Sequence, residues 1–260
     1  MTKSPEELLA MQFGGATVAE NLRAAIEAGT LVENDDGTLE LAADPHFRPV
    51  RWMRVQNASE QEPPAPDSHF LSQVMFEQAY ARSAVPYGCR ECYKVKAVPR
   101  TLRQLVAAWG IAKHIQCRSK WGIDLDNPYS QDVYAGYFYT TGLDRARALF
   151  KVVREAFDAD AKLGPHVPLT IKRGCSEFEA KLGPSDQYTF APELEELETY
   201  LRSKFRKRRR RDTLNIALAY WIDVAYRIGD DTYLDFTGGK RLRPKMVTYD
   251  PREDATAELL

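Results

Sequence analysis

The sequence predicts an α+β fold built on a ferredoxin-like βαββαβ core. Three observations lead to this prediction: segments of alternating hydrophobicity, two amphipathic helical patterns, and the order in which they follow one another. The chain has 260 residues, 44% of them hydrophobic and 11% aromatic, which is enough for a sizeable core. Its 36 basic and 37 acidic residues give a formal net charge of −1, so the overall charge indicates neither a nucleic-acid nor a membrane partner.

The N-terminal part is expected to form a helix and a β-hairpin. Residues 5–28 have hydrophobic residues near helical spacing, with a break at Gly14-Gly15. Residues 30–33 and 38–41 flank Asn34-Asp35-Asp36-Gly37, which is a good hairpin signal, and a short strand is expected over 50–55. Residues 57–67 are polar and contain prolines, so they predict a loop or linker. Residues 1–60 are therefore predicted to be an accessory module.

The middle of the chain, residues 61–190, has the clearest pattern and is predicted to be the core domain. Helices are expected over 101–115 and 144–157. Four strands are expected, over 92–98, 115–123, 133–141 and 169–175. Together these elements have the order β-α-β-β-α-β, which is the ferredoxin-like arrangement and names a topology only.

Residues 191–260 are predicted to form a C-terminal helical brace. Residues 192–211 are acidic at their start and basic at their end, which complements a helix dipole. A more apolar helix is expected over 213–228, followed by a strand-like segment over 232–236. No apolar run approaches the roughly 20 residues of a membrane-spanning helix, and the N-terminus lacks a long apolar segment, so a cytoplasmic protein without a membrane partner is expected.

All four cysteines lie between positions 89 and 175, and they predict a metal centre. Cys89 and Cys92 form a C-x-x-C pair, whereas Cys117 and Cys175 follow singly. Four thiolates fill one tetrahedral zinc site or ligate one [4Fe–4S] cluster. Cys117 and Cys175 are far apart in the sequence, whereas small zinc ribbons usually have two tight cysteine pairs, and basic residues lie beside the cysteines. Both features favour iron–sulfur over zinc. The sequence thus predicts a [4Fe–4S] cluster on Cys89, Cys92, Cys117 and Cys175, with zinc as the alternative.

Strand parity raises one objection to this centre. A ferredoxin-like sheet places Cys89 and Cys92 near Cys175, but it puts Cys117 toward the opposite end and on the core face. The alternatives are a three-cysteine site, or buried cysteines that act as small hydrophobic residues beside an incidental C-x-x-C pair. If Cys117 is not a ligand, one iron is open and an enzyme becomes plausible, so whether the chain is an enzyme is left open.

The alternation of side chains along the strands also predicts a basic surface on the side of the sheet that faces away from the two helices. Tyr137 and Tyr139 are expected to lie among its cations. The residues assigned to anion or nucleic-acid binding in this region are Lys94, Lys96, Arg118, Lys120, Lys172 and Arg173. Cations alternating with tyrosines on an open sheet are typical of a platform for single-stranded RNA, although no RNP-type motif is present. The alternative is a solvated face, or one covered by helices whose glutamates pair with the lysines.

A second basic segment lies near the C-terminus, over residues 206–211. Its members assigned to binding are Arg206, Arg208, Arg209 and Arg210. Such a run can bind a phosphate backbone or an acidic protein surface, or it can be the solvated end of a helix.

Two functional hypotheses follow from these residues. The first is a [4Fe–4S] protein in electron transfer, redox sensing or cofactor-related chemistry, with a redox partner protein or an anionic substrate held by the cations. The second is an RNA- or DNA-binding protein with structural zinc or no metal, which uses the open face and the Arg206–Arg211 run. A further alternative is an assembly factor whose helical tail docks on an acidic partner. The oligomeric state is not predicted.

Overall fold

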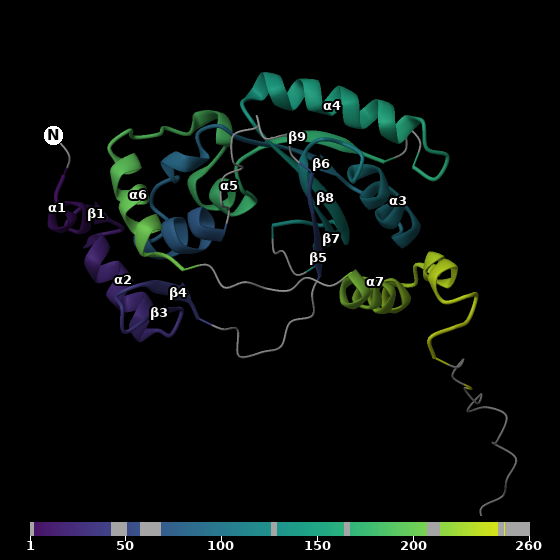
Figure 1. Cartoon of the computed structure of the whole chain (residues 1–260), viewed down its shortest axis with the longest axis horizontal. Helices are drawn as coiled ribbons and strands as arrows, with labels where there is room; N and C mark the ends of the chain where they lie inside the picture. The colour runs from purple at the N-terminus through teal and green to yellow at the C-terminus, as the bar shows by residue number, and fades with distance from the viewer. Residues whose placement is uncertain are drawn as a thin grey trace, which may run out of the picture.

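The structure, a computed structural model, describes residues 3–42, 51–57, 69–125, 129–163, 167–206, 214–243 and 247. Helices and strands are mixed along the chain, so the predicted α+β class is confirmed. Figure 1 shows a central sheet with one group of helices on its right and a second group, with the N-terminus, on its left.

Five strands form one sheet in the order β5-β7-β8-β6-β9, and all neighbours are antiparallel. Their bounds are β5 (Trp52–Gln56), β6 (Cys92–Ala97), β7 (Arg118–Ile123), β8 (Tyr134–Thr141) and β9 (Leu169–Arg173). The ends of the last four lie within two residues of the predicted ends, except that β7 begins three residues later than predicted. Strand β5 adds an edge beside β7.

Three helices cover one face of this sheet: α3 (Leu102–Ala112), α4 (Leu143–Asp158) and α7 (Leu214–Ile228). The core between them contains Trp121, Phe138, Phe157 and Trp221, each fully buried. The alternation that predicted the strands arises because every second side chain enters this core. We call the other side of the sheet the open face.

A second hydrophobic cluster lies beyond one end of the open face and contains the N-terminal helices. Its helices are α1 (Pro5–Leu9), α2 (Val18–Glu27), η1 (His69–Ala79), η2 (Tyr87–Cys89), α5 (Ser176–Leu182) and α6 (Leu194–Lys204). Phe70, Phe76 and Phe178 are among its fully buried residues. Helix α5 follows β9 directly, and η2 directly precedes β6, so this cluster is attached to the sheet at two adjacent strands.

The remaining elements are short. Two hairpins are formed by β1 (Gln12–Phe13) with β2 (Ala16–Thr17), and by β3 (Leu31–Glu33) with β4 (Leu39–Leu41). Single helical turns are η4 (Ser185–Gln187) and η5 (Asp231–Phe236). The β3–β4 hairpin confirms the turn signal at residues 34–37.

Three local predictions differ from the structure. Residues 5–28 form a helix, a hairpin and a second helix, because Gly14 and Gly15 adopt positive φ values of 61° and 89° and turn the chain. Residues 231–236 form a 3-10 helix and not a strand, and the Asp230 side chain caps it by accepting the Thr232 N–H. Helices η1 and α5 had not been predicted.

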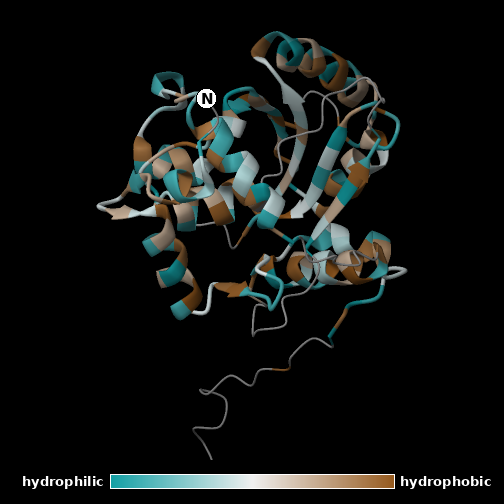
Figure 2. Ribbon diagram, turned by 60° about the vertical axis from the view of Figure 1, so that its left-hand side comes forward, coloured by the Kyte–Doolittle hydropathy of each residue, from teal (hydrophilic) through white to brown (hydrophobic). Residues whose placement is uncertain are grey.

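Helix amphipathicity matches this layered arrangement. Figure 2 shows hydrophobic and hydrophilic residues mixed along the helices, with no uniformly hydrophobic one. Over the described parts of the chain, no helix is both long and apolar enough to cross a membrane.

Candidate functional site

The four cysteines do not form the predicted metal centre. All four are free and buried, but they belong to different hydrophobic clusters. Cys117 lies in the core on the helix side of the sheet, and its thiol donates to the Tyr139 carbonyl at 3.2 Å. The other three, Cys89, Cys92 and Cys175, lie in the second cluster.

Within the described residues, no group of three or more His, Cys, Asp or Glu side chains is placed to hold a metal ion. The prediction of a metal-binding, iron–sulfur function is therefore wrong. Burial raises the pKa of Cys89 and of Cys92, and it raises the pKa of Cys175 to about 11 although Lys94 opposes the shift. The three thiols are consequently neutral at pH 7 and pack as small hydrophobic groups.

The open face carries cations and aromatic rings in register across the strands. Arg54 on β5 pairs with Lys120 on β7, Lys120 pairs with Tyr137 on β8, and Tyr137 pairs with Lys96 on β6. Paired residues of adjacent strands point to the same face, so these four side chains form one row. We call it the Lys120 row.

A second row runs beside it. Lys94 on β6 lies between Tyr139 on β8 and Lys172 on β9. Arg118 lies on the same face of β7, two residues before Lys120. We call Arg118, Tyr139, Lys94 and Lys172 the Lys94 row.

Tyr137 lies at the centre of this surface. The ammonium groups of Lys120, Lys94 and Lys96 lie 4.9, 5.6 and 6.0 Å from its ring centroid, and the Trp52 ring lies 5.9 Å away. These distances are within the range of cation–π contacts. The Tyr137 hydroxyl donates to the buried Asp124 carboxylate at 2.9 Å. Burial and Asp124 raise the pKa of Tyr137, so its hydroxyl stays protonated at neutral pH.

The lysines have different partners. Lys96 forms an ion pair with Asp132 at 2.5 Å, and Lys172 forms one with Glu179 at 2.9 Å. The Lys120 ammonium lies over the Trp52 ring at 4.3 Å. In the part of the chain that the structure describes, no carboxylate lies within ion-pair distance of Lys120.

Lys94 is the most enclosed of the four, with 8% of its surface exposed. Its ammonium donates to the Cys175 sulfur at 3.7 Å. Burial lowers the pKa of Lys94, but Cys175, Tyr139, Cys92 and Glu177 together raise it above its ordinary value, so the ammonium stays charged. Glu177 on α5 also favours this charge, and it accepts a hydrogen bond from Ser72 on η1 at 2.7 Å. The second cluster thus covers the Lys94 end of the open face.

Cations gather on this surface. They are Arg54, Lys94, Lys96, Arg118, Lys120 and Lys172. Carboxylates that pair with side chains of this surface or act on them include Asp124, Asp132, Glu177 and Glu179. Such a gathering of cations favours an anionic ligand.

Two other predicted binding residues lie away from the open face. The Arg173 guanidinium donates to the Ser185 and Arg90 carbonyls at 3.1 and 2.9 Å, and so joins β9 to neighbouring loops. Arg206 follows α6, and its guanidinium bonds to Asp36 of the N-terminal hairpin at 2.6 Å. Arg208, Arg209 and Arg210 lie outside the described residues.

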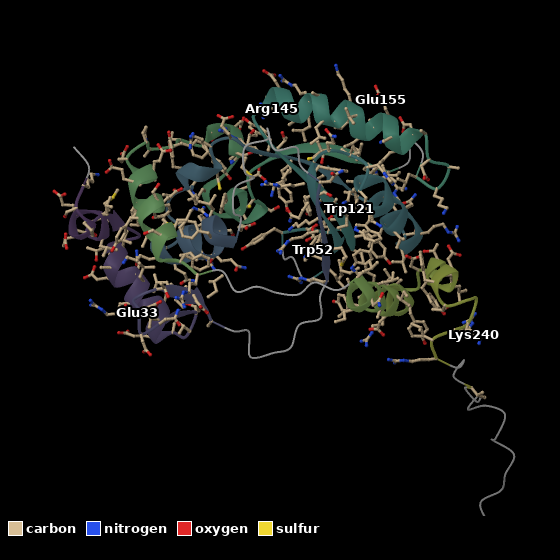
Figure 3. The ribbon with its side chains drawn as sticks, viewed as in Figure 1. Glu33, Trp52, Trp121, Arg145, Glu155 and Lys240 are labelled. Carbon is tan, nitrogen blue, oxygen red and sulfur yellow. The ribbon has the colours of Figure 1, made fainter. Side chains whose placement is uncertain are left out.

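Sequence reasoning missed Trp52 as a member of this surface. Trp52 pairs with Gly122 of β7, whereas its neighbour Met53 pairs with Trp121, so the two tryptophans face opposite sides of the sheet. Figure 3 labels both, with Trp52 on the side of the second cluster. Trp52 lies on the far side of the predicted linker from the core strands, so no local signal placed it beside Lys120.

No family model, curated protein or solved structure matches this chain.

Proposed function

We propose that this protein binds a single-stranded nucleic acid on the open face of its sheet. The observation that supports this most is the register of the two rows, which places a tyrosine of β8 between cations of the adjacent strands. Single-stranded ligands are bound through phosphates that pair with cations and through bases that stack on aromatic rings. Part of Trp52, Arg118 and Lys120 is exposed on this face and supplies both kinds of group, whereas Tyr137 is buried beneath them.

Lys120, Arg118 and Trp52 are the residues we assign to direct contact. Each is half-buried, so part of its surface can meet a ligand. Lys94 and Lys172 are assigned a supporting role, because they already hold Cys175, Ser176 and Glu179. Lys94 and Lys172 thus fasten the second cluster to the sheet and contribute long-range charge.

For the architecture, we propose that β6 to β9 with α3 and α4 form a ferredoxin-like unit. Support comes from the strand order β7-β8-β6-β9 and from the two helices on one face. Strand β5 and helix α7 extend this unit on its β7 side. The N-terminal helix and hairpin module and the C-terminal helix pair, with boundaries near residues 60 and 190, stay predictions.

The first test measures how binding depends on salt. Fluorescence anisotropy of a labelled single-stranded oligonucleotide is titrated between 50 and 300 mM salt. Each neutralised phosphate contributes about 0.7 to the slope of log K against log salt for single strands. The double variant Arg118→Gln/Lys120→Gln is expected to lower that slope by about 1.4 and to weaken binding about tenfold at low salt.

Arg145→Glu is the matched control for this test. Arg145 is exposed on α4, on the helix side of the sheet, and is labelled in Figure 3. Charge reversal there is expected to leave the slope unchanged, because α4 lies on the opposite face. If Arg145→Glu and the double variant weaken binding equally, binding is nonspecific and the open face is not the site.

The second test concerns stacking on Trp52. Trp52→Ala removes the largest ring of the surface and is expected to weaken oligonucleotide binding by about 5- to 150-fold, since one stacked base contributes about 1–3 kcal/mol. Trp52→Phe keeps a ring and is expected to retain most of the affinity. Equal affinities of Trp52→Ala and the unchanged protein, with equal unfolding midpoints, would contradict the stacking role.

A further inference from the structure

The Lys120 amine differs from the other open-face lysines in its surroundings. Its nitrogen lies 4.3 Å from the Trp52 ring centroid and 4.9 Å from the Tyr137 centroid, between two aromatic side chains. Lys96 and Lys172 have carboxylate partners, whereas no described carboxylate lies within ion-pair distance of Lys120. Part of the Lys120 residue is exposed, but its amine is largely removed from water.

Groups from every neighbouring element act on the charge of this amine. Lys94 on β6 opposes protonation, and Arg54 lies directly opposite on β5. Asp124 at the end of β7, with Cys175 and Glu177 near α5, favours protonation, as do the faces of the two rings.

Burial, and then Lys94, dominate this balance and lower the pKa of Lys120 to about 8. At pH 7 the neutral fraction is then about 300-fold larger than for a lysine with the ordinary pKa of 10.5. A lysine that is desolvated beside another cation is a recognised form of activated nucleophile.

We propose that Lys120 is a nucleophilic amine that forms an imine with an aldehyde carried by a phosphate-bearing ligand on the open face. This inference rests on the proposed function and specifies its substrate class. In a single-stranded nucleic acid, such an aldehyde is the ring-opened sugar of an abasic position. A small phosphorylated aldehyde has the same chemistry, and the experiment below separates the two.

The step needs no oxidant or reductant. The lone pair of the neutral Lys120 nitrogen attacks the carbonyl carbon, the C–N bond forms, and the carbonyl π electrons move to oxygen. Proton transfer from nitrogen to this oxygen gives a carbinolamine, which loses the oxygen as water after taking up a proton. The product is a protonated imine on Lys120. Its positive charge replaces the one that Lys120 carries at low pH.

The neighbouring residues have defined roles in this step. Trp52 offers a ring face beside the amine, on which an adjacent base can stack. Arg118 lies on the same strand face and can hold a neighbouring phosphate. Lys94 remains protonated and acts as a positioning residue, because its charge adds to the effect of burial in lowering the pKa of the Lys120 amine.

The test traps the imine in the full-length chain. A single-stranded oligonucleotide with one abasic position is incubated with the protein and sodium cyanoborohydride, which reduces the imine to a stable secondary amine. Pyridoxal 5′-phosphate with borohydride is the small-aldehyde probe in a parallel reaction. Adducts are counted by gel and assigned by peptide mass spectrometry, and binding of the intact oligonucleotide is measured separately by anisotropy.

Two variants make the result specific. Lys120→Arg keeps a cation but cannot form the trapped product, so at equal fractions of bound oligonucleotide, as measured by anisotropy, it is expected to give at least about tenfold less adduct than the unchanged protein. Lys151→Arg, at an exposed position of α4, is the control and is expected to leave the adduct unchanged. The trapping rate is expected to rise with pH and level off above about pH 8, as the amine becomes fully neutral.

Each outcome has one meaning. Adduct at Lys120 from the abasic oligonucleotide supports the proposal with a nucleic-acid substrate. Adduct at Lys120 from the small aldehyde alone, without oligonucleotide binding, supports the nucleophilic amine and overturns the nucleic-acid function. Oligonucleotide binding without adduct, or adduct spread equally over several lysines, overturns the imine proposal and leaves the binding function intact. A trapping rate still rising at pH 10 also overturns it.

Discussion

Replacing Glu198 by Ala is expected to destabilise the protein by about 3–5 kcal/mol. This carboxylate lies on α6 with 6% of its surface exposed. It accepts hydrogen bonds from the Tyr87 and Gly88 N–H groups at 2.6 and 2.8 Å and from the Tyr80 hydroxyl at 3.0 Å. Without it, one buried donor and two part-buried donors lose their acceptor at once. The free energy of unfolding in urea measures the loss.

Glu195→Ala is the control on the same helix. Glu195 is exposed, and its side chain forms a weak ion pair with Arg90 at 4.0 Å, so its loss is expected to change stability by less than about 0.5 kcal/mol. The two variants share the helix, the residue type and the substitution, and they differ only in burial and bonding. Equal effects would contradict the bracing role of Glu198.

The contribution of Glu198 to stability is also expected to depend on pH, in a direction that its pKa shift fixes. Burial raises the pKa of Glu198 above its ordinary value, although the bonds from Gly88, Tyr87 and Tyr80 lower it again in part. Between the unfolded and the raised folded pKa the native state holds more protons than the unfolded state, so this group's contribution to stability falls as pH rises. Glu198→Gln cannot titrate. The stability difference between the unchanged protein and Glu198→Gln is therefore expected to be larger at about pH 4 than at pH 7.

Glu198 also matters for the open face. By accepting hydrogen bonds from the Tyr87 and Gly88 N–H groups, it fixes η2, the turn that leads through Arg90 and Glu91 into β6. Strand β6 carries Lys94 and Lys96 of the two rows. Loss of the brace is thus expected to loosen the end of the sheet at which the second cluster is attached.

Replacing Gly136 by Ala is the second change with a large expected effect, a destabilisation of about 3 kcal/mol or more. Gly136 pairs with Trp121 on β7, and the indole lies across it. A Cβ at position 136 would lie 2.0 Å from the Trp121 ring, and Trp121 is fully buried. The indole also packs against Phe138 and Phe157, so it cannot move without disturbing the core. Thermal and urea unfolding measure the change.

Gly110→Ala is the matched control, with the opposite expected sign. Gly110 lies inside α3, and an added Cβ meets no atom within 4 Å. Alanine in a helix interior is favoured over glycine, so a stabilisation of about 0.5–1 kcal/mol is expected. If both glycine substitutions change stability in the same direction, the role assigned to the Trp121–Gly136 contact is wrong.

The strands of the main sheet could be read from the sequence because their evidence is local. In β6, Val95 and Ala97 are fully buried, while Lys94 and Lys96 between them point to the other face. This alternation can be recognised from neighbouring residues in the sequence, because a sheet that is covered on one side needs hydrophobic residues on that side. The amphipathic spacing of α3 and α4 is local in the same way.

The cysteines show where local evidence fails. The C-x-x-C spacing places two sulfurs near each other, but a metal site needs a third and a fourth ligand from distant parts of the chain. Cys117 lies on the helix side of the sheet, and Cys175 makes its contact with Lys94 on the open face. The alternation of side chains along the strand had already predicted that Cys117 lies on the helix side. In the structure it does lie on that side, away from the other three cysteines.

Composition and periodicity by themselves determined that this chain folds with mixed helices and strands, and that cations on three strands share a face of the sheet with tyrosines on a fourth. The tertiary structure decided what those residues meet. It placed Trp52 over Lys120, and it set Glu177 and Cys175 beside Lys94. The physical reason is the separation in sequence of the residues that interact. Secondary structure depends mainly on residues that are close together along the chain. Burial, ion pairing and the charge of an amine are instead set by side chains that only folding brings within a few ångströms.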